Sequence, residues 1–445
     1  MLKKRFRPFG LCFIILSFLI IFSLNSCTVA GSDTVYPKHT LLENMNRDIS
    51  EEYNSAWKYL DKWDFPKFSS YRFQELEAIF EDKYYKDIPD PLTAAKKTAE
   101  KFLEEYYDGT ELGNEDAVTE ALLNCYTKAV GDKYSVYRTP VEYGDYSGNM
   151  SGNYIGIGIT VTKLVEGESD IIHVIEVSEG SSAQAAGILP DDRIVRINGT
   201  AVADVGYDKA VDLILGEEGS TVYLGIIRGS KPLNVSAVRK KIEEKSVTYS
   251  LDDGIGYIRI KSFKANTASQ FKEAIDHMKA NGARGIIYDV RDNGGGYLSA
   301  VESMLDYIAP DGIKLVSFSN DYGEPYYSGD SHSFSLPSVV ICNKNTASAA
   351  ELFCHGVRDL SDMGYFAASV VGVTTHGKGI MQATYHLSDG STVTLTVAYY
   401  NPPLGKNYHE VGIKPDRIVK MTESGDAQLD AARLEIVSLI GSGGN

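Results

Sequence analysis

The chain has 445 residues, of which 43% are hydrophobic and 23% charged, a composition typical of a folded protein with two to four domains. Its 44 basic and 60 acidic side chains give a formal net charge of −16, which argues against nucleic-acid binding because phosphates attract basic surfaces. Beyond residue 27 only Cys125, Cys342 and Cys354 remain, and this odd, sparse set predicts neither a disulfide framework nor a zinc site. We therefore expect no metal and no cofactor.

The N-terminus has the pattern of an export signal. Four basic residues precede an apolar run from Leu11 to Leu24, and Leu24-Asn25-Ser26-Cys27 resembles a bacterial lipoprotein processing site. We predict that residues 1–27 are a lipoprotein-type signal and that Cys27 carries a lipid. The body would then be membrane-anchored outside the cytoplasm, on the outer side of the cell membrane or in the periplasm. An uncleaved membrane anchor and a soluble secreted form stay open as alternatives.

Residues 28–150 are predicted to form an N-terminal helical region and a linker. Apolar side chains recur at helical spacing between Leu41 and Val130, as in the set Phe73, Leu76 and Phe80. Such a stripe is usually the core of a helical subdomain, although it could also mediate a homodimer. Glycine and serine are frequent between residues 131 and 152, which predicts the linker.

Residues 151–239 are predicted to form a compact module that opens with alternating glycines, whose backbone N–H groups can approach a ligand closely. Strands are expected at 171–177, 193–197 and 222–228, and helices at 182–186 and 207–215. This order resembles a PDZ domain. The resemblance implies that a protein C-terminus binds as an added strand and that the opening segment holds its carboxylate. The implied peptide-binding residues are Tyr154, Ile155, Gly156, Ile157, Gly158 and Ile159.

Residues 240–423 show alternating strand and helix patterns, which predict an α/β layer. Its expected strands are 256–260, 285–290 and 338–342, and its expected helices are 268–281 and 299–308. A C-terminal helix and tail are expected at 424–445. The predicted fold class is therefore multidomain α+β, with a helical region, a PDZ domain and an α/β core.

Ser348 lies among small residues just before a helical run that begins at Ala349. A helix N-terminus offers unsatisfied N–H groups and a positive dipole, which stabilise negative charge on an attacking serine or a tetrahedral intermediate. The simpler interpretation is a capping box, because Ser348-x-x-Glu351 is a common way to start a helix.

Lys378 is the residue that favours chemistry at Ser348. It lies between two glycines after a strand-like run, and a buried lysine with a lowered pKa can act as the base that a serine needs. Gln382 follows four residues later, a spacing that spans about 13 Å in a strand, so the chain must turn if Gln382 is to orient Lys378.

A phosphate-binding loop is the rival interpretation of this stretch. Residues 372–378 fit the first seven positions of Gly-x4-Gly-Lys, but Gly379 occupies the position of the magnesium-binding Ser or Thr. Residues 380–387 also read as a strand, whereas such a loop leads into a helix.

Three glycines, Gly294 to Gly296, follow the predicted strand 285–290. Such a loop can direct backbone N–H groups at an oxyanion, and the N–H of Ala349 could supply a second donor. A plain loop that leads into a helix is the alternative.

These segments together resemble the carboxy-terminal processing (tail-specific) proteases. The resemblance rests on residues 254–260, the Asn293–Gly296 loop, Ser348-Ala-Ala-Glu351, Gly377-Lys378-Gly379 and residues 411–416, and it extends from about residue 131 to 416. It implies that Ser348 is the nucleophile, Lys378 the general base and Gln382 the residue that positions the lysine. Gly295 or Gly296, with Ala349, would form the oxyanion hole.

Two departures from the family pattern concern the base. About five extra residues separate the serine from the lysine, around Leu360 to Phe366, and a surface loop is expected to absorb them. His376 stands where the family usually has an aromatic residue, and its imidazole could shift the pKa of Lys378. A Ser-His-Asp enzyme using His355 or His376 is the alternative, although no Gly-x-Ser-x-Gly elbow is present.

The sequence thus predicts an exported, membrane-tethered serine endopeptidase. Its PDZ domain would capture apolar C-terminal tails of proteins or peptides, and cleavage would proceed through an acyl-enzyme. The competing hypothesis is a catalytically inactive PDZ scaffold that only binds protein tails.

Overall fold

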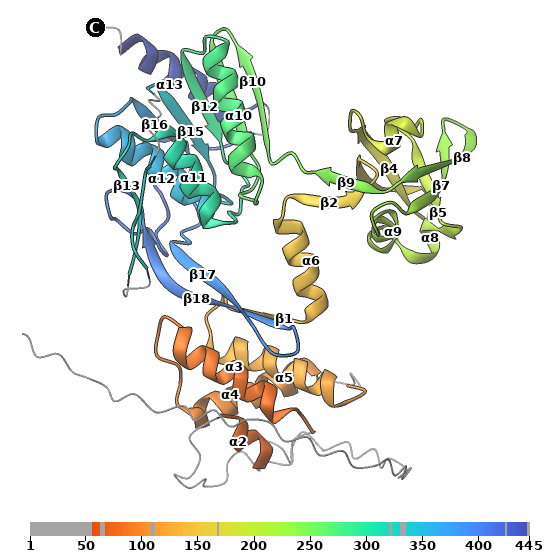
Figure 1. Ribbon diagram of the computed structural model, residues 1–445. Coiled ribbons are helices and arrows are strands. Elements are labelled where there is room, and N and C mark those ends of the chain that lie inside the picture. The colour runs from red at the N-terminus through yellow and green to blue at the C-terminus, as the bar shows by residue number, and fades with distance from the viewer. Residues whose placement is uncertain are drawn as a thin grey trace, which may run out of the picture. The chain divides into compact units, whose positions relative to one another are not determined.

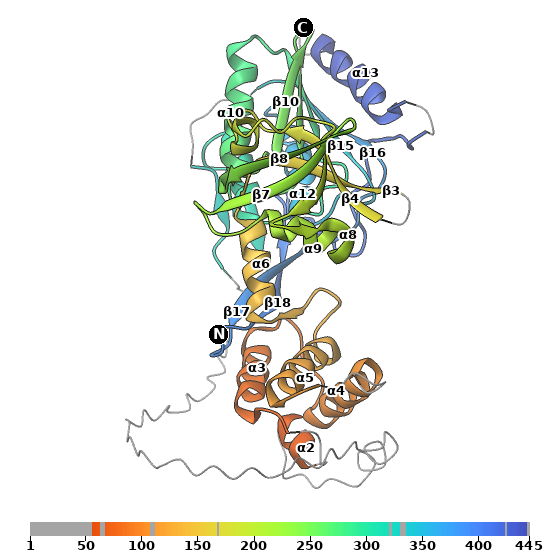
Figure 2. The same cartoon turned by 90° about the vertical axis from the view of Figure 1, so that its right-hand side faces the viewer.

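The computed structural model describes residues 56–62, 67–106, 112–166, 169–319, 323–329, 335–422 and 425–442. The predicted signal segment with Cys27 lies outside these ranges. Within them, no helix combines the length and the apolar character that a bilayer crossing needs. Figures 1 and 2 show the elements from two sides.

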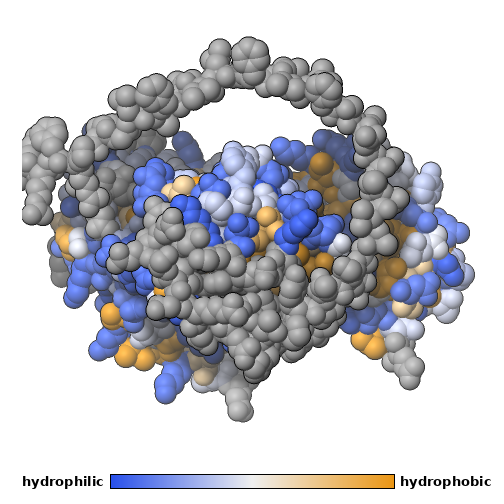
Figure 3. All heavy atoms as spheres, turned by 90° about the horizontal axis from the view of Figure 1, so that it is seen from below, coloured by the Kyte–Doolittle hydropathy of each residue, from blue (hydrophilic) through white to orange (hydrophobic). Residues whose placement is uncertain are grey.

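The described part of the N-terminal region is helical, as predicted. Its helices are α2 (Ala56–Lys62), α3 (Ser70–Lys83), α4 (Pro91–Tyr106) and α5 (Glu115–Val130). The predicted apolar stripe is buried, since Phe73 and Leu76 are fully inaccessible and Phe80 is 1% exposed. On the face shown in Figure 3, hydrophilic side chains predominate and hydrophobic ones lie in small groups. The homodimer stays a prediction.

The segment 131–152, predicted as a linker, contains regular secondary structure. Residues Val136–Arg138 form strand β1, and Pro140–Met150 form helix α6. The helix start was readable, because Thr139 and Glu142 form a capping box around Pro140 at the first helical position. The frequent glycines and serines concealed this signal.

The module after residue 151 has the PDZ elements that the sequence predicts. Its sheet has the order β3 (Ile159–Glu166), β4 (Ser169–Val177), β5 (Arg193–Ile197), β7 (Thr221–Arg228) and β8 (Lys231–Val238), and β6 (Thr200–Ala201) pairs with β5. Helices α7 (Ser182–Ala185), α8 (Val202–Val205) and α9 (Tyr207–Ile214) complete it. Strand β3 ends the order, so one of its edges pairs with no other described strand and can accept an added one.

The six predicted peptide-binding residues are divided between two sheets. Tyr154, Ile155 and Gly156 belong to strand β2 (Asn153–Gly156), which pairs with β9 (Lys240–Glu243) outside the PDZ sheet. Ile157 is buried in the PDZ core, and Gly158 leads into β3 with φ +82°. Only 157–159 therefore lie at the start of the PDZ sheet, and the peptide-binding role of the six residues stays a prediction.

The α/β core is built on a six-stranded sheet. The strand order is β10 (Val247–Asp252), β11 (Ile255–Ile260), β12 (Gly285–Asp289), β15 (Ser338–Cys342), β16 (Ala368–Gly372) and β19 (Arg417–Ile418). All neighbouring pairs are parallel except β10 with β11. Strands β12 and β15 are buried at every position, which explains their unbroken apolar sequences.

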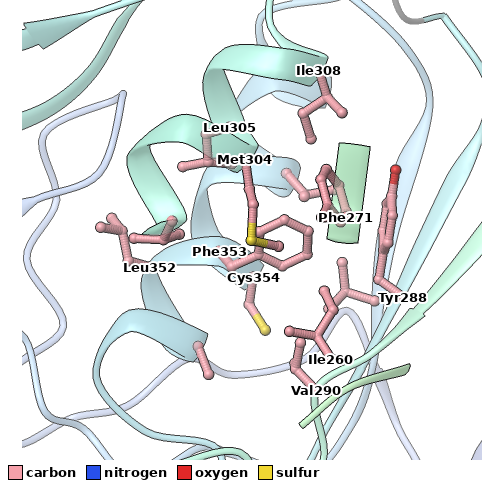
Figure 4. Close-up of a cluster of buried hydrophobic side chains, with 14 of the residues drawn as sticks. Ile260, Phe271, Tyr288, Val290, Met304, Leu305, Ile308, Leu352, Phe353 and Cys354 are labelled. Carbon is pink, nitrogen blue, oxygen red and sulfur yellow. The ribbon is translucent and has the colours of Figure 1, made fainter. Parts of the chain in front are cut away.

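Helices cover both faces of this sheet. Alternate residues of β12 and β15 point to opposite sides. Tyr288 and Val340 pack with helices α10 (Thr267–Ala280), α11 (Leu298–Ile308) and α12 (Ala349–Asp362), and Figure 4 shows Tyr288 beside Phe271, Met304 and Phe353 in this layer. Ile287 and Ile341 pack on the other face with helix α13 (Ala427–Ser442), the predicted C-terminal helix.

A second sheet adjoins the site described below. Its central strand β18 (Thr392–Asn401) pairs with β17 (Ile380–His386), β1 and β13 (Lys314–Phe318), and β13 also pairs with β14 (Tyr326–Tyr327). Strand β1 thereby attaches the segment predicted as a linker to strands that follow Lys378.

Candidate active site

Ser348 lies where β15 gives way to helix α12. Its backbone adopts φ +57° and ψ −123°, a conformation that costs free energy for a residue with a Cβ atom. The Ser348 N–H donates to Glu351 Oε2 at 2.8 Å, which is one half of the predicted capping box and holds this conformation. This contact therefore holds the backbone of Ser348 in its strained conformation.

Glu351 joins the serine segment to the lysine segment. Its fully buried carboxylate accepts hydrogen bonds from the N–H of Ser348 (2.8 Å), Gly377 (2.7 Å) and Lys378 (2.8 Å) and from the Thr375 hydroxyl (2.5 Å). The sequence interpretation gave Glu351 only a capping role. Because this internal carboxylate occupies the Gly377 and Lys378 amides and strand β17 follows, the phosphate-loop alternative is wrong.

Lys378 is held as a candidate base. Its Nζ donates to Gln382 Oε1 at 2.6 Å and lies 4.9 Å from the centre of the Tyr134 ring. Burial lowers the pKa of Lys378, while the negative charges of Asp132 and Glu351 partly oppose this shift. The Lys378 amine is therefore closer to its neutral form than an ordinary lysine at a given pH.

The chain makes the turn that pairing of Lys378 with Gln382 demands. Gly377 adopts φ +88°, strand β17 starts only at Ile380, and its pairing with β18 is irregular between Met381 and Gln382. The Gln382 Nε2 then donates to the carbonyl of Tyr134 at 2.5 Å, which fixes the orientation of the amide.

The glycine loop lies against the serine. A Cβ atom on Gly295 would come within 2.8 Å of the Ser348 Cβ, and one on Gly296 within 2.1 Å of the Phe263 carbonyl oxygen. The Gly295 N–H already donates to Asn293 Oδ1 at 2.9 Å. Of the two glycines predicted for the oxyanion hole, Gly296 is therefore the better candidate donor alongside Ala349. Gly295 has no side chain and so leaves room for Ser348.

One cavity of about 730 Å³ brings the predicted residues together. Ser348, Lys378 and Gln382 line it with Ala349 and the three glycines Gly294 to Gly296. The cavity is also lined by residues that the sequence interpretation missed, among them Tyr134, Arg138 and Tyr400.

Comparison with known proteins agrees with this geometry. Residues 254–419 match the model of peptidase family S41, and residues 149–227 match the PDZ domain. The carboxy-terminal processing protease CtpA of Bacillus subtilis is 32% identical over 72% of this chain and 67% of its own length. The chain belongs to peptidase family S41.

Another relative and a solved structure are similar to this S41 chain. A probable CtpA-like serine protease of Staphylococcus haemolyticus is 33% identical over 70% of this chain, which spans 61% of that relative. A putative S41 protease of Bacteroides fragilis has a similar fold, with a TM-score of 0.50 and 18% identity over 82% of this chain and 97% of that structure.

Two buried tyrosines connect the backbone carbonyls of Lys378 and Ser348. The Tyr400 hydroxyl donates to the Lys378 carbonyl at 3.0 Å, and the Tyr408 hydroxyl lies 3.1 Å from that of Tyr400 and 3.4 Å from the Ser348 carbonyl. Burial raises the pKa of both phenols, so they stay neutral. No local motif indicated them, because Tyr400 is one aromatic residue at the end of an apolar strand and Tyr408 lies in a polar loop.

The histidines considered as alternatives are elsewhere in this S41 core. His355 pairs with Asp359 at 2.9 Å within helix α12, and His376 is exposed, with its backbone N–H bonded to the Thr346 carbonyl. Neither lines the cavity with Ser348. The extra residues around Leu360 to Phe366 fall at the end of α12 and in the turn that follows it, where Gly364 and Tyr365 are exposed although Leu360 and Phe366 are buried.

Proposed function

We propose that this S41 chain is a serine endopeptidase in which Ser348 attacks a scissile carbonyl and Lys378 is the general base. The observation that carries the proposal is the buried Lys378 amine, held by Gln382 in the cavity that Ser348 also lines. A neutral amine there can take the hydroxyl proton as the Ser348 oxygen forms a bond to the carbonyl carbon.

The remaining steps use the same groups. The N–H groups of Ala349 and Gly296 stabilise the oxyanion of the tetrahedral intermediate, which collapses as the Lys378 ammonium gives its proton to the leaving amine. Water then gives a proton to Lys378 and attacks the acyl-enzyme, and the second collapse returns the proton to the Ser348 oxygen. No step needs a metal or a cofactor.

We further propose that the PDZ domain recruits substrates by their apolar C-terminal tails. The open edge of strand β3 supports this role, because a peptide can add there as a strand. Export, lipidation at Cys27 and attachment to a membrane remain proposals that rest on the N-terminal sequence alone.

The test is incubation of the full chain with an unstructured protein that ends in an apolar tail, followed by mass spectrometry of the products. We expect internal cleavage upstream of the tail, slower cleavage when the tail is replaced by charged residues, and no loss of activity in EDTA. Tail binding without any cleavage would instead support the inactive scaffold.

Gln382→Glu is expected to move the pH dependence of cleavage. In the wild type, kcat/KM should rise with pH through a pKa below the ordinary lysine value, because only the neutral amine is a base. A carboxylate at this position, 2.6 Å from the amine in the wild type, would favour the ammonium and raise this pKa. A pH–rate profile of both enzymes checks the shift. If kcat/KM of Gln382→Glu rises over the same pH range as in the wild type, Lys378 does not control this rise.

Glu351→Gln is expected to lower kcat/KM by about 100-fold and to destabilise the fold by about 2–4 kcal/mol. The carboxylate accepts four hydrogen bonds, whereas glutamine offers one oxygen and directs an NH₂ group at the remaining donors. Thr375→Val removes one of the four bonds to Glu351, together with the bond that the Thr375 hydroxyl accepts from the Ile413 N–H, and it should lower kcat/KM less than Glu351→Gln does. Activity is measured well below the unfolding midpoint, and wild-type kcat/KM there would contradict a positioning role.

A further inference from the structure

The cavity around Ser348 is positively charged in an acidic protein. Among the 22 described residues that line it, Lys133, Arg138 and Lys378 are basic and none is acidic. The whole chain has 60 acidic and 44 basic residues, so a random set of this size would hold about three acidic side chains. The lining therefore favours anionic groups on whatever peptide enters it.

Arg138 is the basic side chain best arranged to bind such a group. It is half-buried on β1, its Nη1 donates to Thr394 Oγ1 at 2.9 Å, and its guanidinium stacks on Tyr146 at 4.2 Å. No ion pair in the described ranges involves Arg138. Because a guanidinium has five N–H donors and this bond uses one, most of the fork is available to a carboxylate.

The other two basic residues are poorer anchors. Lys378 is engaged with Gln382 as the proposed base. Lys133 is fully exposed and lies 4.8 Å from the Tyr134 ring, so a carboxylate there would compete with water and be screened by salt. Of the two basic lining residues that are not assigned to catalysis, Arg138 is the one that is partly buried and held in a fixed orientation.

Strand register places Arg138 at a short distance from the proposed base. Thr394 of β18 is opposite Thr384 of β17, and the Thr384 and Thr394 hydroxyls are 2.9 Å apart. Thr384 is two residues beyond Gln382, which is about 7 Å along a strand, and β18 lies about 5 Å across. An extended peptide covers this separation in roughly two to four residues.

We propose that Arg138 anchors a carboxylate subsite of the cleft. It binds a peptide carboxylate, from an Asp or Glu side chain or from the substrate's own C-terminus, two to four residues from the scissile bond. This assignment names the substrate class of the proposed peptidase and rests on that function. The rest of the wall is largely apolar and accepts hydrophobic neighbours, through Val136, Met150, Leu298, Ile380 and Met381.

The test uses fluorogenic peptides in which one glutamate is moved from two to four residues before and after the cleaved bond. Each peptide has a glutamine twin, and each is made with a free and with an amidated C-terminus, which separates the two sources of carboxylate. The enzymes are the full-length wild type, Arg138→Gln, Arg138→Lys and the control Lys420→Gln, which removes one exposed charge of the peptidase region.

For the wild type, kcat/KM should be about tenfold higher for a glutamate peptide, or a free C-terminus, at the matching position. Arg138→Gln should bring this ratio close to one and leave the glutamine twin within about threefold, Arg138→Lys should keep part of the ratio, and Lys420→Gln all of it. A ratio near one in the wild type at every position, or an unchanged ratio in Arg138→Gln, overturns the proposal. If Arg138→Gln lowers kcat/KM equally for the glutamate and the glutamine peptide, Arg138 serves only to hold Tyr146, and the proposal is overturned.

A binding measurement separates this proposal from the proposed function. If the wild type cleaves no peptide, the peptidase proposal fails, and the affinities of the same twins are measured with the Ser348→Ala variant. A tenfold preference for the carboxylate that disappears in the Ser348→Ala, Arg138→Gln double variant would support the subsite even then. Equal affinities would overturn it.

Discussion

Ser348→Ala is expected to lower kcat/KM for a cleaved peptide by about 10⁴-fold or more, because no other group can form the acyl-enzyme. The substitution removes one hydroxyl and keeps the Cβ atom, so the Ser348 N–H can still donate to Glu351 and hold φ at +57°. Affinity for a tail peptide should stay within about threefold of wild type, because the PDZ sheet is untouched.

The matched control for Ser348→Ala is Ser303→Ala on the exposed side of helix α11, where the hydroxyl only bonds the Ser299 carbonyl of the previous turn. That variant should retain wild-type cleavage. Peptide cleavage by Ser348→Ala within tenfold of the wild type would assign the nucleophile elsewhere. If neither the wild type nor Ser348→Ala cleaves the peptide and both still bind the tail, the inactive-scaffold hypothesis is favoured.

Lys378→Met is expected to lower kcat/KM by about 10³-fold, the typical contribution of a general base. Methionine has a similar length and no charge, and burial already disfavours the ammonium at this position. The fold should therefore survive, with a thermal midpoint within a few degrees of the wild type, whereas the proton of the Ser348 hydroxyl loses its acceptor.

The control for Lys378→Met is Lys420→Met, which removes an exposed lysine. A pH profile adds a second readout, because the residual activity of Lys378→Met should no longer show the limb assigned to the lysine. Retention of more than about a tenth of wild-type kcat/KM would show that another group takes the proton.

The sequence predicted the layers of the core well because its strongest signals are local. Strands β12 and β15 have short apolar centres bounded by turn residues, and burial on both faces of a sheet explains such runs. Ser348 and Lys378 were readable for a similar reason, since each lies in a short motif at the end of a strand. Their shared cavity follows from β15 and β16 being parallel neighbours.

The contacts that shape the site were less predictable because they join distant parts of the chain. The Tyr134 carbonyl and the Gln382 amide are 248 positions apart, and no local pattern links them. The irregular pairing at Gln382 depends on the register of β18, which a single strand does not reveal. The helix at 140–150 was missed for a different reason, because the frequent glycine and serine residues masked the capping box at Thr139.

The role of Glu351 shows how one motif can serve two purposes. Ser348-x-x-Glu351 does start a helix, as the simpler interpretation held, but the same carboxylate also bonds the amides beside the base. Helix capping and alignment of the proposed catalytic pair are therefore one structural feature. Sequence spacing could show the first function, and only the approach of the Gly377 loop could show the second.

The most direct test of the proposed Ser348–Lys378 pair is labelling with a fluorophosphonate, which reacts with an activated serine. After incubation of the full-length chain, we expect a single adduct that peptide mapping places on Ser348. Its formation rate should rise with pH through the lowered pKa of Lys378, and Lys378→Met should react far more slowly. An adduct on another residue, or equal labelling rates in wild type and Lys378→Met, would show that Ser348 and Lys378 do not act as a catalytic pair.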